Sequence, residues 1–388
     1  MDFSSAWRRE LAGMAAIGIA AGLVTIFGAP AATAATCPAV SSAGVVTPAP
    51  TPGVDWSDCN LGGANLSAAD LSGANLRGAS LGHANLTSAN LTGADLGSAR
   101  LYWTTLTGAT LTGVVLAGSQ LYLVVSGQIT GTPARFPANW SLAGGYLIGP
   151  YDNLENASLA GVSLSGVDLE NAMINQADLS GADLANADLT NAQLGASDLS
   201  GANLTDADLN TFYVNDLTLT GANLSGTRFA YNGYLTGVVS GGITGTPANL
   251  PYYPNGQYVL GGGYLAGPGA DLAGANLASV NLTGASLVAN ANLSDANLTG
   301  ANLTSAALGA DLSGTELAGA NLTDIDSQGD TGTPASLPNH WAYINGYLLG
   351  PTVGLLSRRS TRTSLAMTSL TWTSPGGNSI TPTWPAPT

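Results

Sequence analysis

The side chains that could do chemistry in this chain are few. Its two histidines, His83 and His340, lie far apart in the sequence and have no cysteine neighbours, so the sequence does not predict a zinc site. The sequence also lacks a Gly-x-Ser-x-Gly nucleophile turn, a phosphate-binding loop and a His-Glu-x-x-His motif. We therefore expect no catalytic residue, no cofactor and no metal.

The acidic side chains are numerous, but they recur at one position of a short repeat. The chain has 24 Asp and Glu against nine Arg, with no Lys, and a formal net charge of −15. A surface this acidic repels nucleic acid, so direct nucleic-acid binding is not expected. A polysaccharide-acting enzyme built on a β-helix stays open as an alternative, although the repeat itself explains why carboxylates cluster here.

The repeat is a leucine at every fifth residue within the consensus Ala-(Asn/Asp)-Leu-(Ser/Thr)-Gly, whose first three residues stand at Ala64-Asn65-Leu66 or Ala182-Asp183-Leu184. Five residues turn an α-helix by about 500°, so successive leucines would spiral round it. In a flat strand an odd step would send alternate leucines to solvent. The chain must therefore bend once per repeat, with glycine at the corner, and stack on itself as a solenoid. The first run of leucines is Leu61, Leu66, Leu71, Leu76, Leu81, Leu86, Leu91, Leu96, Leu101, Leu106, Leu111, Leu116 and Leu121.

This pattern resembles the pentapeptide-repeat family, whose motif is A-(D/N)-L-x-x, over roughly residues 59 to 326. The resemblance implies an all-β fold, a right-handed quadrilateral β-helix with four pentapeptides per coil. It also implies that the leucines and the small residues two before them fill the interior. Nothing catalytic comes with the resemblance.

The repeats fall into three blocks separated by a longer motif, Gly-Thr-Pro-Ala followed by Gly-Tyr-Leu-x-Gly-Pro. We expect its Pro and Gly to form turns in place of helix or regular strand, and the spacers to fold as loops that cover or interrupt the solenoid. In the third block the register slips by one residue at Leu293 and returns at Leu312, which should bulge a corner without ending the stack. The expected segments are a signal peptide (1–35), an N-terminal cap (36–58), block 1 (59–125), a spacer (126–150), block 2 (151–239), a spacer (240–268), block 3 (269–326), a spacer or cap (327–351) and a disordered tail (352–388).

The N-terminus predicts export. Arg8 and Arg9 precede a largely apolar stretch, and Ala32-Thr33-Ala34 is a suitable cleavage site; an uncleaved membrane anchor is the alternative. After cleavage no stable membrane span is expected. The two cysteines, Cys37 and Cys59, form an even pair in an exported chain, which predicts one disulfide closing the N-terminal end of the solenoid.

With four repeats per coil, residues twenty apart should stack in columns about 4.8 Å apart. Asp168, Asp188 and Asp208 then form an acidic ladder, with Arg228 on the next rung. We interpret the ladder as a solvated face; a bound divalent cation is the alternative, although calcium prefers six to eight oxygens. Asparagines such as Asn281 and Asn302 should hydrogen-bond along the stack.

Two outward stripes depart from the consensus and are candidate interaction surfaces. Alternatively, the neighbouring spacers cover them. The residues are Tyr102, Trp103 and Tyr122, near His83, in the first block, and Met173, Phe212 and Tyr213 in the second.

These observations predict a non-enzymatic scaffold, exported to the cell envelope or exterior of a bacterium, that contacts an unknown protein or envelope component. The oligomeric state is left open. The alternative that the family resemblance suggests is a cytoplasmic DNA mimic that binds DNA gyrase.

Overall fold

The computed structural model describes residues 36–351, apart from 212, 232, 254 and 255, together with residues 372–373 and 379–380. The expected signal peptide and most of the expected tail lie outside the described residues. All regular elements in the described part are short β-strands. No helix found there is long and apolar enough to cross a lipid bilayer.

Most pentapeptides close a β-turn. In the first full repeat the Leu61 carbonyl accepts the Ala64 amide at 3.0 Å, and Gly63 between them has φ 68°. A type II turn requires positive φ at its third residue, which explains the glycine two after many leucines. The Asn or Asp before each leucine supports the same corner: the Asn85 Oδ1 accepts the Thr87 amide at 3.0 Å.

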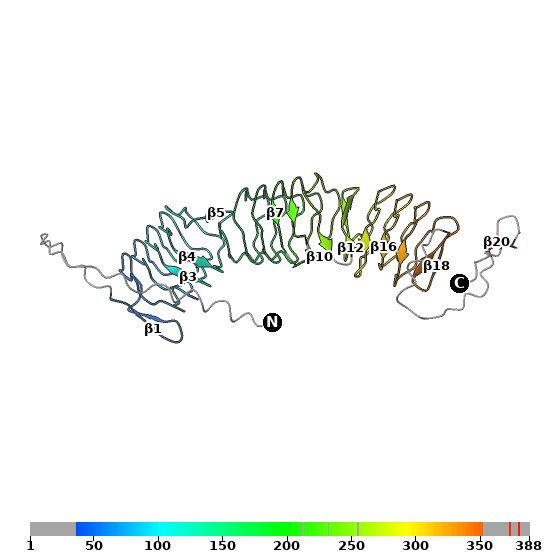
Figure 1. The fold of residues 1–388 in the computed structure, drawn as a ribbon. Coiled ribbons are helices and arrows are strands. Elements are labelled where there is room, and N and C mark those ends of the chain that lie inside the picture. The colour runs from blue at the N-terminus through cyan, green and yellow to red at the C-terminus, as the bar shows by residue number, and fades with distance from the viewer. Residues whose placement is uncertain are drawn as a thin grey trace, which may run out of the picture.

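Successive coils pair as parallel strands twenty residues apart. Asn65 bridges Asn85, and Asp183 bridges Asn203. The Leu66 amide donates to the Asn85 carbonyl, and the Asn85 amide donates to the Ala64 carbonyl, both at 2.8 Å. Four pentapeptides therefore make one coil, and the coils form one elongated, gently arched stack (Figure 1). The right-handed sense of the coil stays a prediction.

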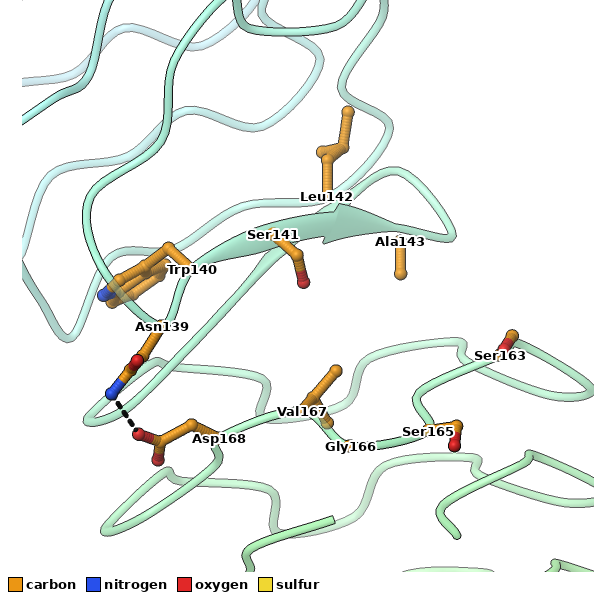
Figure 2. Close-up of a pocket in the computed structure, with 10 residues that line it drawn as sticks. All are labelled: Asn139, Trp140, Ser141, Leu142, Ala143, Ser163, Ser165, Gly166, Val167 and Asp168. Carbon is orange, nitrogen blue, oxygen red and sulfur yellow. Dashed lines mark hydrogen bonds between the residues drawn. The ribbon is translucent and has the colours of Figure 1, made fainter. Parts of the chain in front are cut away.

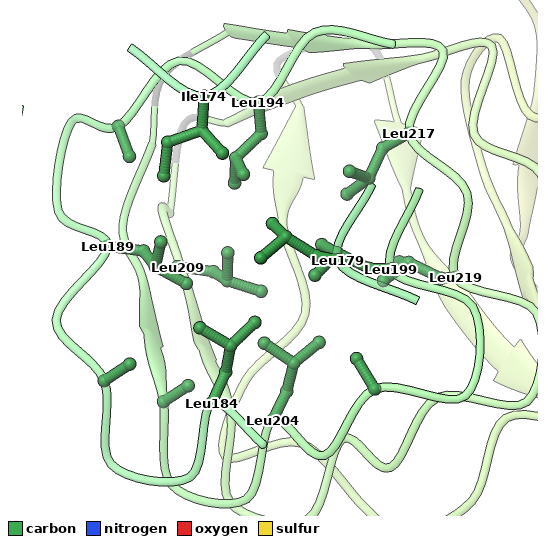
Figure 3. Packing of buried hydrophobic residues seen from close by; sticks show 14 of the residues in the cluster. Ile174, Leu179, Leu184, Leu189, Leu194, Leu199, Leu204, Leu209, Leu217 and Leu219 are labelled. Atoms are coloured by element: carbon green, nitrogen blue, oxygen red, sulfur yellow. The ribbon is translucent and has the colours of Figure 1, made fainter. Parts of the chain in front are cut away.

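The leucines and the small residues two before them line the inside of the coil. Leu184, Leu204 and Ala182 have no exposed surface, and leucines from different sides of the coil point toward a common centre (Figure 3). Burying each leucine contributes about 1.5–3 kcal/mol. The interior positions predicted from the repeat are thus confirmed.

Most sides of a coil pair through single bridges, and a few sides pair over two or three residues. The parallel strands are β3 (Arg100–Tyr102), β4 (Gln120–Tyr122), β7 (Asp208–Leu209), β8 (Tyr213–Asn215), β9 (Arg228–Phe229), β10 (Tyr234–Thr236), β15 (Ser286–Leu287), β16 (Ala307–Leu308) and β17 (Asp326–Ser327). The antiparallel strands are β1 (Ala39–Val40), β2 (Val46–Thr47), β5 (Ser141–Ala143), β6 (Tyr146–Ile148), β11 (Tyr252–Tyr253), β12 (Gly256–Gln257), β13 (Val259–Gly261), β14 (Tyr264–Ala266), β18 (Ala342–Ile344), β19 (Tyr347–Leu349), β20 (Trp372–Thr373) and β21 (Ser379–Ile380).

The parallel pairing runs through the spacers. Val125 bridges Asn153 across the first spacer, and Val239 bridges Asp271 across the second. In the third block the coil from Asp271 to its bridge partner Asn292 is one residue longer than the twenty-residue coil, and the coil from Asn292 to Asp311 is one residue shorter. The inserted and deleted residues are therefore absorbed without ending the stack, as the register of the leucines predicted.

Each spacer contains an antiparallel hairpin, so the expectation of turns in place of regular strand is wrong there. The pairs are β5–β6, β13–β14 and β18–β19. Their two-residue turns have positive φ at both positions: 57° and 80° at Gly144 and Gly145, and 51° and 80° at Asn345 and Gly346. Gly-Gly and Asn-Gly are typical of type I′ turns, which match the twist of paired strands.

The N-terminal end is closed by a large side chain and a crosslink. Trp56 occupies a leucine position at 1% exposure, and neighbouring Asp55 already bridges Asn75. The coil therefore begins within the segment expected to be the N-terminal cap (36–58). The expected disulfide joins Cys37 to Cys59, with Cα atoms 5.3 Å apart.

Candidate interaction surface

Three tyrosines form a column on the outside of the stack, which we call the aromatic row: Tyr102, Tyr122 and Tyr151. Strands β3 and β4 place Leu101 and Leu121 inward, so Tyr102 and Tyr122 point outward in register. Their ring centroids are 6.4 Å apart, and those of Tyr122 and Tyr151 are 5.5 Å apart. The three side chains are 38–41% exposed, so the spacer does not cover them.

Trp103 and His83 extend the aromatic row at the adjacent corner. Their rings stack with centroids 6.2 Å apart and planes 8° apart, and Trp103 is 46% exposed. Both residues adopt φ of 57°, the left-handed conformation that the corner imposes. The corner thus fixes the direction of the two rings.

A polar column runs beside the aromatic row on the same strands. Arg100 and Gln120 are paired in register and exposed, and the Tyr102 hydroxyl donates to the Gln120 Oε1. Tyrosine, tryptophan and arginine are the residues enriched at the energetic centres of protein interfaces. Tyr151 was missed in the sequence because the first spacer breaks the twenty-residue count between Tyr122 and its neighbour on the next coil.

Among the candidate residues predicted in the second block, Met173 does not join the aromatic row. Met173 is half-buried in the column Asn153–Met173–Gln193, which continues from Val125 on the neighbouring side of the coil. Tyr213 begins β8, and Phe212 lies outside the described residues. A separate exposed pair, Tyr231 and Tyr252, stacks with ring centroids 5.6 Å apart.

The residues of the predicted acidic ladder stack on successive coils, where their backbones form parallel bridges. Asp168 bridges Asp188, which bridges Asp208. Each carboxylate accepts a backbone amide two residues on, such as Thr190 for Asp188 at 2.9 Å. Arg228 contacts Asp208 at 3.2 Å at one end, and the Asn139 side chain donates to Asp168 at 2.8 Å at the other. Donors at both ends thus offset the repulsion within the ladder.

Neutral columns also bond along the stack, as expected. The Asn321 side-chain amide donates to the Asn302 Oδ1 at 3.3 Å and to the Thr304 hydroxyl at 3.0 Å. Amides also donate to carboxylates one coil earlier, as from Asn203 to Asp183 at 2.8 Å.

A cleft of about 450 Å³ separates the first hairpin from block 2 (Figure 2). The hydrogen bond between Asn139 and Asp168 crosses one end of it. The Trp140 ring packs flat over Gly149, where an added Cβ would lie 2.3 Å from the ring. The remaining lining residues are Ser141, Leu142, Ala143, Ser163, Ser165, Gly166 and Val167.

A buried carboxylate lies where the chain leaves the first hairpin. Asp152 stands two residues before Leu154, the position that alanine occupies in the consensus, and is fully buried. Its Oδ1 accepts the Asn153 amide at 2.9 Å, but its Oδ2 has no hydrogen-bond partner among the described residues. Burial raises the pKa of Asp152 well above its usual value. An Asp in the position that the consensus gives to Ala is the sequence signal that marks this buried carboxylate.

A second buried carboxylate lies in the third spacer, beside the turn of the β18–β19 hairpin, where the Asp330 amide donates to the Gly346 carbonyl at 3.2 Å. Asp330 stands where the first two spacers have Ile129 and Ile243 and is 5% exposed. It accepts the Ala310 amide at 3.0 Å and the Ser327 hydroxyl. Burial raises the pKa of Asp330, and these hydrogen bonds partly oppose that rise. Neither carboxylate belongs to a group of three or more potential metal ligands within the described part of the chain.

The family profile described as "Pentapeptide repeats" matches in eight copies, within residues 53–82, 153–191, 177–213, 197–230, 270–309 and 288–326. A search of curated proteins finds no significant match.

Solved structures with similarity include HetL, a pentapeptide repeat protein involved in heterocyst differentiation regulation from Nostoc sp. strain PCC 7120. It is 23% identical, the match covers 73% of this chain and 89% of HetL, and the TM-score is 0.16. A trypsin-treated variant of QnrB1, a plasmid-mediated fluoroquinolone resistance protein, is 16% identical over 50% of this chain and 84% of its own, with TM-score 0.23. A pentapeptide repeat protein of the Arabidopsis thaliana thylakoid lumen is 18% identical over 42% and 65%, with TM-score 0.13. The five-residue repeat, the twenty-residue coil and the family profile agree, and the chain belongs to the pentapeptide-repeat family.

Proposed function

We propose that this chain is an exported, non-catalytic scaffold whose aromatic row binds a protein or another component of the cell envelope. The observation that carries the proposal is the exposed, ordered aromatic row beside Arg100. Exposed apolar patches of this kind mark contact sites more often than chance. The coils hold the rings in place, so little side-chain entropy is lost on binding.

Export is supported by the N-terminal sequence and by the disulfide. A stable Cys37–Cys59 bond is expected in an oxidising compartment and is unusual in the cytosol. Fractionation of the producing cell, with N-terminal mass spectrometry, tests this part. We expect a mature chain beginning near Ala35 in the medium or envelope, with Cys37 bonded to Cys59. An intact chain in the cytoplasm with free thiols would contradict export.

The contact surface is tested separately, by binding to purified cell envelopes of the producing organism. Trp103→Ala combined with Tyr122→Ala should weaken binding at least about ten-fold, because truncating central aromatic contacts commonly costs about 2 kcal/mol or more. The matched control is Tyr231→Ala with Tyr252→Ala, which removes an exposed aromatic pair elsewhere on the stack. Equal effects of the two double variants would refute the aromatic row as the contact surface.

The DNA-mimic alternative has one supporting observation, the acidic ladder formed by Asp168, Asp188 and Asp208. It requires cytoplasmic retention and inhibition of purified DNA gyrase. Gyrase inhibition that is lost when the ladder is changed to asparagine would favour this alternative over the scaffold.

A further inference from the structure

The first coil of block 2 has unpaired backbone groups where it faces the first hairpin. Inside block 2, the Asp188 amide donates to the Val167 carbonyl at 2.9 Å, and the Leu169 amide donates to the Asp188 carbonyl at 2.7 Å. Asp168 lies one coil earlier in the same column, and Ser163 lies beside it in the neighbouring column. Neither the amides nor the carbonyls of these two residues form a hydrogen bond with a described residue. They point toward the hairpin across the cleft of about 450 Å³ (Figure 2).

The second hairpin closes the equivalent space. Gln257 there forms a parallel bridge with Ala285. Counted back from the Gly-Tyr-Leu of each hairpin, the equivalent residues of the first are Asn139 and Val167, and the described backbone has no bridge between them. The Asn139 side chain instead donates to the Asp168 Oδ2 at 2.8 Å. The opening is therefore a feature of the first hairpin and not of hairpins in this solenoid generally.

The walls of the cleft combine an aromatic ring with small side chains. The half-buried ring of Trp140 borders it at one end. Ser141 and Ala143 point from β5 toward block 2 (Figure 2). The exposed residues Ser163 and Ser165 line the opposite wall. Hydroxyl groups that both donate and accept hydrogen bonds therefore lie on both walls.

The polar pair beside Trp140 is held in place. Asp168 accepts the Asn139 side-chain amide through Oδ2 and the Glu170 backbone amide through Oδ1, at 2.8 and 3.1 Å. Each carboxylate oxygen keeps lone-pair capacity for a donor on a ligand. The residues lining the described cleft include no Arg, Lys or His, and Asp168 begins the acidic ladder. The site therefore favours a neutral ligand over an anion.

The unpaired backbone groups lie around a corner, which matters for the shape of the ligand. Ser163 and Asp168 are on adjacent sides of the coil, separated by a turn in which Gly166 has φ 67° and the Val167 amide donates to the Leu164 carbonyl at 3.4 Å. A straight peptide strand could pair with only one of the two sides. A compact ring with polar groups on its edge can reach both.

We propose that the cleft binds a neutral saccharide of one or two rings. The Trp140 ring contacts the C–H face of a sugar, because an aromatic side chain supplies a large apolar surface. Asp168 accepts hydroxyl protons, and the free Ser163 amide donates to a hydroxyl oxygen. A volume of about 450 Å³ lies within the range of small-molecule sites. The proposal does not depend on the proposed function, because the aromatic row contributes no residue to the cleft.

Isothermal titration of the full-length chain with glucose, N-acetylglucosamine, cellobiose, maltose and N,N′-diacetylchitobiose tests the proposal. At least one of these sugars should bind with a Kd of about 1 mM or tighter, and glucuronic acid should bind more weakly than glucose. Asp168→Ala should weaken binding about ten-fold or more, because a charged acceptor is lost. The matched control is Asp188→Ala, on the next rung of the acidic ladder and outside the cleft, which should leave the Kd unchanged.

A second pair of variants separates this site from the aromatic row. Ser165→Trp fills the cleft from an exposed position and should abolish binding, with an unchanged melting temperature as the check on folding. Trp103→Ala combined with Tyr122→Ala should leave sugar binding intact, so the saccharide site and the proposed function can fail separately.

Two results would overturn the saccharide site: no binding by any sugar of the panel at millimolar concentration, or equal losses in Asp168→Ala and Asp188→Ala. Where a sugar binds, competition identifies its source. Displacement by neutral glycan released from the envelope of the producing organism assigns a polymer, and displacement by free sugars alone assigns a diffusible saccharide.

Discussion

The first junction, where the β5–β6 hairpin meets block 2, and the second junction, where the β13–β14 hairpin meets block 3, contain the same kind of hairpin. They differ in how completely their aromatic and polar side chains are buried and hydrogen-bonded. At the second, Tyr258 is 1% exposed and its hydroxyl donates to the carbonyls of Leu235 and Pro268. At the first, the equivalent Trp140 is half-buried and borders the cleft. The second has Ala270 where the first buries Asp152 with one oxygen unpartnered among the described residues. The repeat thus determines the path of the chain, and a few substituted positions determine where polarity and open space occur.

The largest expected effect on stability is at the second junction, where Tyr258 is fully buried. Tyr258→Ala should lower the unfolding free energy by about 3–5 kcal/mol, because it removes a fully buried ring. Trp140→Ala should cost about half as much, since part of that ring is already exposed. Repeat arrays often depart from two-state unfolding, so hydrogen exchange of β13–β14 and β5–β6 is the appropriate measurement. A larger loss for Trp140→Ala would contradict the comparison.

The next largest effect on stability should come from removing the buried carboxylate at the first junction, or from adding one at the equivalent position of the second junction. Asp152→Ala should stabilise the chain by about 1–3 kcal/mol at neutral pH, because an unpaired buried polar group is removed. The reciprocal Ala270→Asp should destabilise it.

The sign of the pH dependence follows from the raised pKa of Asp152. The native state favours the protonated carboxyl of Asp152, so the contribution of this residue to stability is most favourable below the ordinary pKa of 3.8 and falls as the pH rises above it. The advantage of Asp152→Ala should therefore shrink in acid. Thermal unfolding between pH 3 and pH 7 measures this, and an advantage that grows in acid would refute it.

Removing the charge of the buried Asp330 in the third spacer should change stability less than removing that of Asp152, because both Asp330 oxygens have hydrogen-bond partners. Asp330→Asn keeps an acceptor for the Ala310 amide, so we expect a change of at most about 1 kcal/mol at neutral pH. The raised pKa of Asp330 makes its contribution fall as the pH rises above 3.8. The opening free energy of the β18–β19 amides, measured by hydrogen exchange, should thus depend less on pH in the variant. A pH dependence equal to that of the unchanged chain would show that Asp330 does not cause it.

The smallest effect is expected on the coil surface. Hydrogen bonds from the Ser180 hydroxyl and amide lower the pKa of Asp178, so its contribution is present above pH 3.8 and is lost as the pH falls. Because the side chain is exposed, Asp178→Asn should change stability by only a few tenths of a kcal/mol. Thermal unfolding at pH 2 and pH 6 measures this; a change as large as that for Asp152→Ala would contradict the distinction between surface and junction.

The sequence predicted the coil well because each coil repeats the same local physics. Leucine spacing and corner glycines such as Gly63 follow from neighbouring residues, and the pairing of Cys37 with Cys59 follows because the chain has two cysteines. The hairpins were missed because Gly144-Gly145 and Asn345-Gly346 were interpreted as irregular turns, although such pairs are typical of type I′ turns. Tyr151 joined the aromatic row only through tertiary structure, since the whole first spacer separates it from its neighbour Tyr122 in the sequence.

Continuity of the stack across the spacers is the central claim, and engineered disulfides test it most directly. Bridged residues on adjacent coils lie about 4.8 Å apart, within reach of a disulfide. Val125→Cys with Asn153→Cys should therefore crosslink under mild oxidation, as should the within-block pair Asn85→Cys with Thr105→Cys. Val125→Cys with Ser158→Cys places the thiols on different sides of a coil and should not. Non-reducing peptide mass spectrometry that finds the 85–105 link without the 125–153 link would contradict the continuous solenoid.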